Sequence, residues 1–137
     1  MKILATVLTA VIMITSSIVS KESKSVTATV VNVTSNKGKV SFALYNKATF
    51  MRQPLQSKNA KIVDGKSTVT FENLAPGEYA IICFHDKNDN DKMDFQENGM
   101  PMEDYGATNN VMTFGPPTYD NSKFTLSNEN LVFEIKF

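Results

Sequence analysis

Histidine, cysteine and tryptophan are almost missing from this chain of 137 residues, which has one His, one Cys and no Trp. One imidazole and one thiol exclude the multi-histidine and thiolate clusters that bind zinc, and a single thiol excludes an internal disulfide. Net charge is missing as well, because 14 Lys and Arg balance 14 Asp and Glu. Since nucleic-acid binding depends on clustered cations, we expect no nucleic-acid partner.

The N-terminus carries the one long apolar segment. Met1-Lys2 precedes a mostly apolar stretch that ends at Ile14, and small residues follow as far as Ser20. This order is typical of a secretory signal, and the stretch is shorter than the roughly 20 residues that a membrane-spanning helix needs. We therefore expect residues 1–20 to be a helical signal peptide, with a retained anchor as the alternative. Cleavage would leave residues 21–137 as one periplasmic or secreted domain without stable membrane insertion.

Beyond Lys24 the sequence alternates apolar residues with polar or small ones, and turn residues separate the alternating segments. Val40, Phe42 and Leu44 show this period of two, and so do residues 131–137. The period is typical of half-buried β-strands, and frequent turns between strands are typical of sandwiches. Amphipathic helical spacing is absent. The sequence predicts an all-β fold: a single antiparallel β-sandwich of about seven strands.

Turn residues predict which strands are neighbours. Asn36-Lys37-Gly38 should join strands 25–34 and 40–45 into a hairpin, and Asp64-Gly65 should join 61–63 to 67–71.

Other segments are expected to cover or fill the core. Residues 46–59 break the alternation and predict a crossing loop or one short helical turn. Pro76-Gly77 predicts a tight turn after a strand that ends at Phe71, with Leu74 closing the end of the sandwich. Cys83 lies in an apolar run, so we interpret it as a buried small hydrophobic residue rather than a reactive thiol.

Oxygen-bearing side chains are concentrated between Phe84 and Gly99. Counted from Asp86 as position one, their spacing matches that of a twelve-residue calcium loop. In such a loop the odd-numbered side chains converge on the ion, and a carboxylate at position twelve completes the shell. The predicted ligands of a structural Ca²⁺ ion are Asp86, Asn88, Asn90, Lys92 through its carbonyl, Asp94 and Glu97.

Two features depart from the calcium-loop pattern. Asp91 occupies position six, where the motif has Gly because the backbone φ is positive there. The loop also follows a strand, so it cannot belong to a helix-loop-helix unit. The alternative is a solvated, Asx-rich turn that binds no ion.

A second segment, from Gly99 to Tyr119, combines glycine, proline, amide and aromatic residues. Long ordered loops of this kind often form binding surfaces, and the alternative is a loop that packs only on itself. The residues predicted for a ligand surface are His85, Glu103, Tyr105, Asn109, Phe114 and Tyr119.

Several motifs together resemble a known family. They are the segment from Gly38 to Asn46, the segment from Phe71 to Ile81, Phe84-His85-Asp86 with Asn88-Asp89-Asn90 and Asp94, Gly99-Met100-Pro101 with Glu103 and Tyr105-Gly106, and Phe114-Gly115-Pro116-Pro117. Over roughly residues 26–137 the chain resembles the secreted bacterial family catalogued as domain of unknown function 2141. The resemblance implies a small exported β-sandwich related to prealbumin-like and carboxypeptidase-regulatory-like domains, with no established activity. The Leu-x-Pro-Gly-x-Tyr segment is also similar to that of adhesin B-type repeats, whose loops often bind Ca²⁺.

These observations favour a binding or accessory module over an enzyme. The chain has no Gly-x-Ser-x-Gly elbow and no cysteine near His85 able to act as a nucleophile, so a nucleophilic triad lacks its usual parts. The expected partner is a small molecule, a glycan or a cell-envelope protein. One alternative is a carbohydrate-binding module that uses Tyr105, Phe114 and Tyr119 as exposed platforms. Another is a periplasmic hydrolase that uses His85 with a carboxylate.

Overall fold

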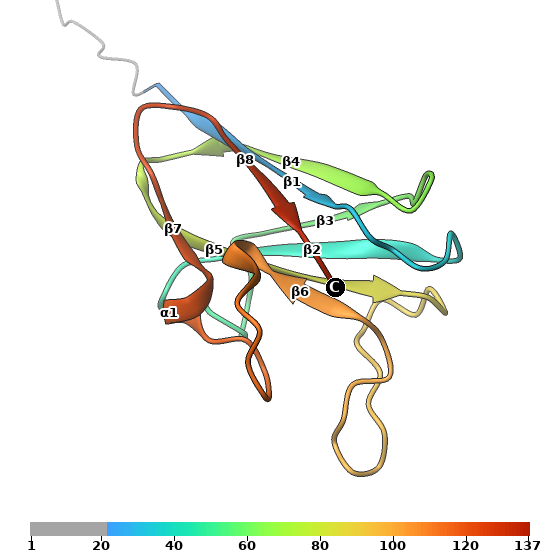
Figure 1. The fold of residues 1–137 in the computed structure, drawn as a ribbon. Coiled ribbons are helices and arrows are strands. Elements are labelled where there is room, and N and C mark those ends of the chain that lie inside the picture. The colour runs from blue at the N-terminus through green and yellow to red at the C-terminus, as the bar shows by residue number, and fades with distance from the viewer. Residues whose placement is uncertain (1–21) are drawn as a thin grey trace, which may run out of the picture.

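The computed structural model describes residues 22–137, so the predicted signal peptide over residues 1–20 lies outside the described residues. Eight strands form two sheets. The first sheet has the order β4-β1-β8, from Ser67–Leu74, Lys24–Val30 and Leu131–Ile135. The second has the order β3-β2-β5-β6, from Gln56–Ala60, Lys39–Tyr45, Gly77–Asp86 and Tyr105–Ala107, and β7 (Lys123–Leu126) pairs with β5. Figure 1 shows the two sheets as stacked layers. The predicted all-β sandwich is confirmed.

The core lies between the sheets because alternate residues of each strand point inward. In β2, Val40, Phe42 and Leu44 are at most 1% exposed, whereas the residues between them are half-buried. Ile135 of β8 and Cys83 of β5 are fully buried in the same core, which agrees with the interpretation of Cys83 as a small hydrophobic residue. Burial raises the pKa of the Cys83 thiol well above its ordinary value.

The predicted hairpin between the first two strands is wrong. β1 pairs with β4 on one side, antiparallel, and with β8 on the other side, parallel. β2 instead pairs with β3 and β5 in the second sheet. The turn at Gly38 therefore carries the chain from one layer to the other, and the apolar faces of β1 and β2 meet across the core instead of side by side.

The second predicted hairpin is reduced to its turn. Asp64 and Gly65 have φ angles of 52° and 72°, and Val63 and Lys66 exchange two backbone hydrogen bonds. The strands beyond this bridge diverge, because β3 pairs with β2 and β4 pairs with β1. The expectation that residues 46–59 form a crossing loop or one short helical turn is also corrected, because their last part is a strand. β3 begins at Gln56, and its mostly polar, exposed side chains gave no alternating signal.

The remaining predicted turn is present, but β4 continues past Phe71 to Leu74, so that Ala75 and Pro76 connect it across the layers to β5, which begins at Gly77. Leu74 is 4% exposed at the end of the core. Two short helices, η1 (Thr108–Asn110) and α1 (Tyr119–Ser122), follow β6. Within residues 22–137, no helix is both long and apolar enough to cross a membrane.

Two long segments extend beyond the second sheet on the side away from the core. Residues 87–104 connect β5 to β6, and residues 111–118 connect η1 to α1. In Figure 1 both segments project away from the layer formed by β4, β1 and β8. These two segments therefore flank the outer face of the second sheet, which is the face turned away from the core.

Candidate functional site

The site begins where β5 ends, at His85 and Asp86. Neighbouring residues of a strand point to opposite faces, so these two side chains diverge. His85 is 2% exposed, and its ring Nε2 donates to the carbonyl oxygen of Lys37 at 2.7 Å. Gly38 (φ 71°) packs against the Asp86 and Lys87 backbone so closely that a Cβ there would overlap it. The His85 imidazole is thus a buried anchor for the turn before β2.

Asp86 organises the following loop by binding its backbone. The carboxylate is fully buried, with Oδ1 accepting from the Asn90 N–H at 3.1 Å and Oδ2 accepting from the Asp91 N–H at 2.8 Å. Asp91 has φ 65°, so it adopts the left-handed conformation that the calcium-loop pattern requires at position six. The departure from Gly at this position is therefore accommodated by the backbone.

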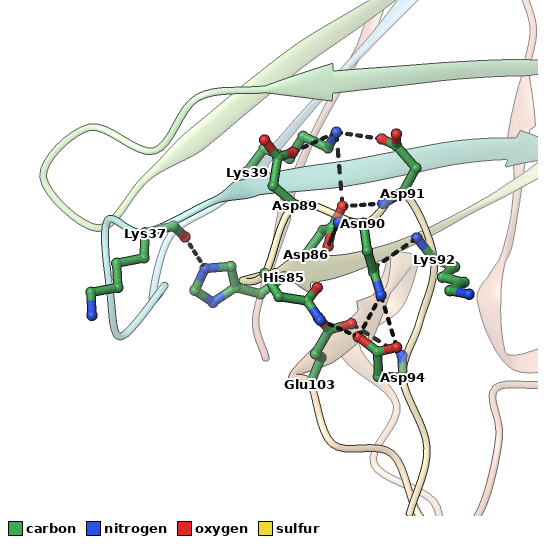
Figure 2. A network of polar contacts seen from close by, with 11 residues as sticks. Lys37, Lys39, His85, Asp86, Asp89, Asn90, Asp91, Lys92, Asp94 and Glu103 are labelled. Atoms are coloured by element: carbon green, nitrogen blue, oxygen red, sulfur yellow. Dashed lines mark hydrogen bonds and ion pairs between the residues drawn. The ribbon is translucent and has the colours of Figure 1, made fainter.

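Lys39 lies among three carboxylates at the top of the loop (Figure 2). Lys39 and Asp86 are register partners of β2 and β5, which places both side chains on the outer face. The Lys39 ammonium lies 2.7 Å from Asp89 Oδ1 and 3.8 Å from Asp86 Oδ2, and it also pairs with Asp91. Hydrogen bonds to Asp89 and then Asp91 raise the pKa of Lys39 well above its ordinary value.

A second cluster of oxygen atoms surrounds Asp94. The side-chain amide of Asn88 donates to Asp94 Oδ2 at 2.7 Å, and that of Asn90 donates to Oδ1 at 2.9 Å. These bonds lower the pKa of Asp94, that of Asn90 most. Glu103 Oε2 accepts from the Asp94 N–H at 3.3 Å. Desolvation, and then the charges of Asp94 and Asp86, raise the pKa of Glu103.

The loop thus presents carboxylates that are able to hold a metal ion. Asp86, Asp89 and Asp91 offer oxygen atoms that all lie within 4.8 Å of one another. Asn88, Asn90 and Asp94 converge separately, and rotation of either amide would turn its oxygen toward the Asp94 carboxylate. Hard oxygen ligands of this kind suit Ca²⁺ or Mg²⁺.

The structure places the predicted ion ligands unequally. Asp86, Asn88, Asn90 and Asp94 belong to one connected network, and the Lys92 N–H joins it by donating to Asn90 Oδ1 at 3.2 Å. Glu97 is exposed, and among the described residues it makes no hydrogen bond or ion pair with this network. Sequence reasoning missed Lys39 and assigned Glu103 to a ligand surface, because neither strand register nor loop folding was visible.

A groove of about 780 Å³ lies between the two long segments and the outer face of the second sheet. Its floor includes Ala43 and Tyr45 of β2, Ile82 and Phe84 of β5, and Tyr105 of β6. One wall comes from the loop after Asp86, and it contains Met93, Phe95 and Met100. The opposite wall includes Gly115, Pro116 and Pro117, with Met51 and Pro54 beyond them. Asp91 belongs both to the carboxylate cluster and to the groove lining, so the two features share a boundary.

The predicted ligand surface is divided among different environments. Tyr105 lines the groove, and its hydroxyl donates to the Gly115 carbonyl at 3.2 Å. The Asn109 amide donates to the carbonyls of Asn121 and Lys123 and so ties η1 to the segment after it.

The other two aromatic residues lie outside the groove. Tyr119 stacks edge-on against Phe50, with 5.5 Å between ring centroids, and its hydroxyl lies 3.2 Å from Glu78 Oε1. Desolvation, and then Glu78, raise the pKa of Tyr119 to about 12. Phe114 is fully exposed. Of Tyr105, Phe114 and Tyr119, only Tyr105 therefore lines the groove.

Comparison with known proteins identifies the family of this chain and assigns it no activity. No curated protein and no solved structure is a significant match to this chain. A family model described as an uncharacterized protein conserved in bacteria, DUF2141, matches residues 28–134. The match spans all eight strands except the first residues of β1 and the last residue of β8. The chain therefore belongs to this family of uncharacterized conserved bacterial proteins, DUF2141.

Proposed function

We propose that this protein is a non-catalytic binding module of the bacterial cell envelope, exported by the segment over residues 1–20. Its ligand binds in the groove on the outer face of the second sheet. The loop after Asp86 forms one wall of this groove, and a structural Ca²⁺ ion bound to the loop sets the position of that wall. The single observation that carries the proposal is the shared boundary at Asp91, which belongs to both the carboxylate cluster and the groove.

The dimensions and lining of the groove support binding. Small-molecule sites have volumes of roughly 300–1,000 Å³ and are mostly apolar with a few polar groups. The groove, at about 780 Å³, falls within this range. Its walls carry Met93, Phe95 and Met100, of which Phe95 and Met100 are 58% and 60% exposed. Apolar side chains this exposed lose unfavourable contact with water when a ligand covers them.

The loop geometry supports the ion. Four predicted ligands already belong to one network, and Asp91 has the backbone conformation that position six needs. The position of Glu103 beside Asp94 supplies a carboxylate that the motif expected from Glu97. Desolvation, and then repulsion by Asp94 and Asp86, raise the pKa of Glu103, and a bound divalent cation would offset that repulsion.

The two alternative functions receive less support. A hydrolase that uses His85 needs this imidazole to reach a substrate, but the side chain is buried and bonded to the Lys37 carbonyl. A carbohydrate-binding module needs aromatic rings on one exposed surface, but of Tyr105, Phe114 and Tyr119 only Tyr105 lines the groove. A binding module with an apolar groove fits both observations.

A calorimetric Ca²⁺ titration of the chelator-treated protein tests the ion. We expect saturable binding, with an affinity of about 10⁻⁴ M or tighter, and a higher melting temperature in Ca²⁺. Asp94→Asn should weaken binding at least ten-fold while keeping an acceptor for the two asparagine amides. Glu129→Gln, an exposed substitution outside the loop, is the matched control and should leave binding unchanged.

A pair of variants decides which glutamate completes the ion shell. Glu103→Gln should weaken Ca²⁺ binding and Glu97→Gln should not, because only Glu103 contacts the network. The reverse result would restore the original twelve-residue spacing and would require the loop to refold around the ion. Absence of heat and of any melting shift at millimolar Ca²⁺ would rule out the ion and leave the groove to be tested by itself.

A further inference from the structure

The floor of the groove is a grid of cross-strand neighbours whose polarity changes across the sheet. The first row contains, in register order from β3 to β6, Asn59, Ser41, Phe84 and Tyr105. The second row contains Ser57, Ala43 and Ile82 in the same order. Both rows line the groove. Each row is polar over β3 and apolar over β5, so the floor itself is amphipathic.

The polar end of the floor has unused hydrogen-bonding groups. Among residues 22–137, no hydrogen bond uses the side chain of Ser41, Ser57 or Asn59. Among the same residues, every buried side-chain polar atom has a hydrogen-bond partner, so these three side chains are not buried without one. These hydroxyl and amide groups therefore face the groove or the water in it. A ligand that brings a donor or an acceptor to this end replaces water without loss of hydrogen bonds.

The charge of the lining selects against anions. Asp91 is the one ionisable acid or base among the lining residues apart from the two tyrosines, and its carboxylate is already paired with Lys39. Lysine, arginine and histidine side chains are missing from the lining. A carboxylate or phosphate placed here would lose hydration without gaining a cation, which is unfavourable. A neutral head group avoids this loss.

The backbone of the floor selects against a peptide. β2 is hydrogen-bonded to β3 on one side and to β5 on the other, so its N–H and C=O groups are used within the sheet. A peptide lying across the floor would bury its own backbone groups with few partners. A compact molecule with an apolar body fits better, since methionine walls adapt to the shape of what they cover.

We propose that the groove binds an uncharged amphiphile, with its apolar body over Ile82 and Phe84 and its hydrogen-bonding head over Ser57 and Asn59. This inference rests on the proposed function, because it names the chemical class of ligand for the same groove. The ligand lies across the strands, under the methionine and proline residues of the two walls, and its head points toward the β3 edge of the sheet.

Two probes of equal chain length but different charge test this class. The protein, expressed as the full chain, is first titrated with Nile red, a neutral dye whose fluorescence rises in apolar surroundings. The bound dye is then displaced with 1-monodecanoylglycerol or with decanoate, each below its critical micelle concentration. We expect 1:1 saturable dye binding and displacement by the neutral monoglyceride at a concentration at least ten-fold lower than that of the anion.

Two lysine variants provide the matched comparison. Met100→Lys places a cation in the groove wall and should reverse the preference toward decanoate. Met112→Lys adds the same charge at a residue that is 95% exposed and outside the groove lining, so the preference should stay unchanged. Asn59→Leu should weaken monoglyceride binding about five-fold by removing one hydrogen bond to the head.

The outcomes separate this inference from the proposed function. Saturable dye binding with equal or better displacement by decanoate overturns the uncharged class but keeps a binding groove. No saturable binding by any probe overturns both. A protein whose mass doubles with concentration, and whose Met100→Lys variant is monomeric, places a second copy in the groove and also overturns the amphiphile. Dye binding that survives Met100→Lys with an unchanged preference shows that the probes bind elsewhere, which overturns the assignment to this groove.

Discussion

The second sheet has two faces built from the same strands, and they differ in how they are closed. The inner face, with Phe42 at 1% exposure and Cys83 at 0%, is sealed by the opposite sheet. The outer face, with Ala43 and Phe84, is only half-buried and is covered by loops that leave a groove of about 780 Å³. The comparison teaches that strand alternation fixes which residues leave the core, while the loops decide whether those residues form a solvated surface or a site.

The largest expected effect distinguishes the two faces directly. Phe42→Ala should destabilise the protein by about 3–5 kcal/mol, because it leaves a cavity in a closed core. Phe84→Ala on the same sheet should cost only about 1–2 kcal/mol, because its ring is half-buried against a groove that water enters. Urea unfolding of the two variants measures the difference. Equal losses would mean that the outer face is packed as tightly as the core and contains no binding groove.

The fold was predictable wherever the period of two is the signal. Val40, Phe42 and Leu44 are inward-facing as expected, and so is Ile135 near the C-terminus. Pairing was not predictable from the turns. The turn before Lys39 has the residues of a hairpin, but the same residues also allow the chain to cross from one layer to the other. β2 does not pair with β1 because β4 and β8 already pair with the two edges of β1. β3 was missed because an edge strand that is exposed on both faces has no apolar alternation.

The candidate site was predictable only along the chain. The spacing from Asp86 to Asp94 identified residues that do converge, since these are joined by local hydrogen bonds. Lys39 and Glu103 reach the same loop from elsewhere in the sequence, through strand register and through the return of the loop to β6. Neither the strand register nor the path of the returning loop can be read from a single sequence. The groove itself depends on three separate segments, so its existence followed only from the folded arrangement.

The next largest effect concerns the loop that covers the outer face. Asp86→Ala should cost about 2 kcal/mol, because the N–H groups of Asn90 and Asp91 lose their acceptor. Hydrogen exchange should show loss of protection at these two amides while the core amides of β2 stay protected. Asp89→Ala, which removes a carboxylate from a 64%-exposed side chain in the same loop, is the control and should change stability by no more than about 0.5 kcal/mol.

Comparison of hydrogen exchange in Asp86→Ala and Asp89→Ala also identifies what holds the loop. If Asp86→Ala and Asp89→Ala lose protection equally, the loop is held by charge pairing with Lys39 and not by the buried acceptor. If neither changes exchange in the loop, the wall of the groove is positioned by its apolar contacts alone.

Lys39 sharpens the comparison between the two oxygen clusters of the loop. Its ammonium lies among Asp86, Asp89 and Asp91, where it takes the place that a divalent ion would need. Lys39→Met should lower the melting temperature in chelator, because three carboxylates lose their cation, and should raise Ca²⁺ affinity about five- to ten-fold, because the loop that binds the ion becomes more negative. Calorimetry and melts with and without Ca²⁺ measure both. Unchanged affinity would mean that the bound ion lies too far from Lys39 to be repelled by its charge.

The smallest effect separates those two carboxylates by pH. The pKa of Glu103 is raised in the folded state, so its charged form is less favourable there than in the unfolded chain. The wild type therefore gains stability relative to Glu103→Gln as the pH falls from the raised pKa of Glu103 toward its ordinary value of 4.5. At higher pH, in chelator, the free energy of unfolding of the variant should be slightly larger than that of the wild type. The pKa of Asp94 is lowered, so its contribution is present at neutral pH and is lost only as pH falls through that lowered value.

The sign of the stability difference between the wild type and Glu103→Gln tests whether Glu103 is an ion ligand whose charge is unfavourable when no ion is bound. In chelator, melts from pH 4 to pH 7 should show the stability gain of Glu103→Gln growing with pH, and water screening should keep it small because the carboxylate is half-exposed. In Ca²⁺ the order should reverse at pH 7, because the wild type then gains a bond to the ion that the glutamine amide supplies less well. A variant that is less stable than the wild type under both conditions would instead make Glu103 a partner that stabilises the Asp94 N–H, with no part in holding an ion.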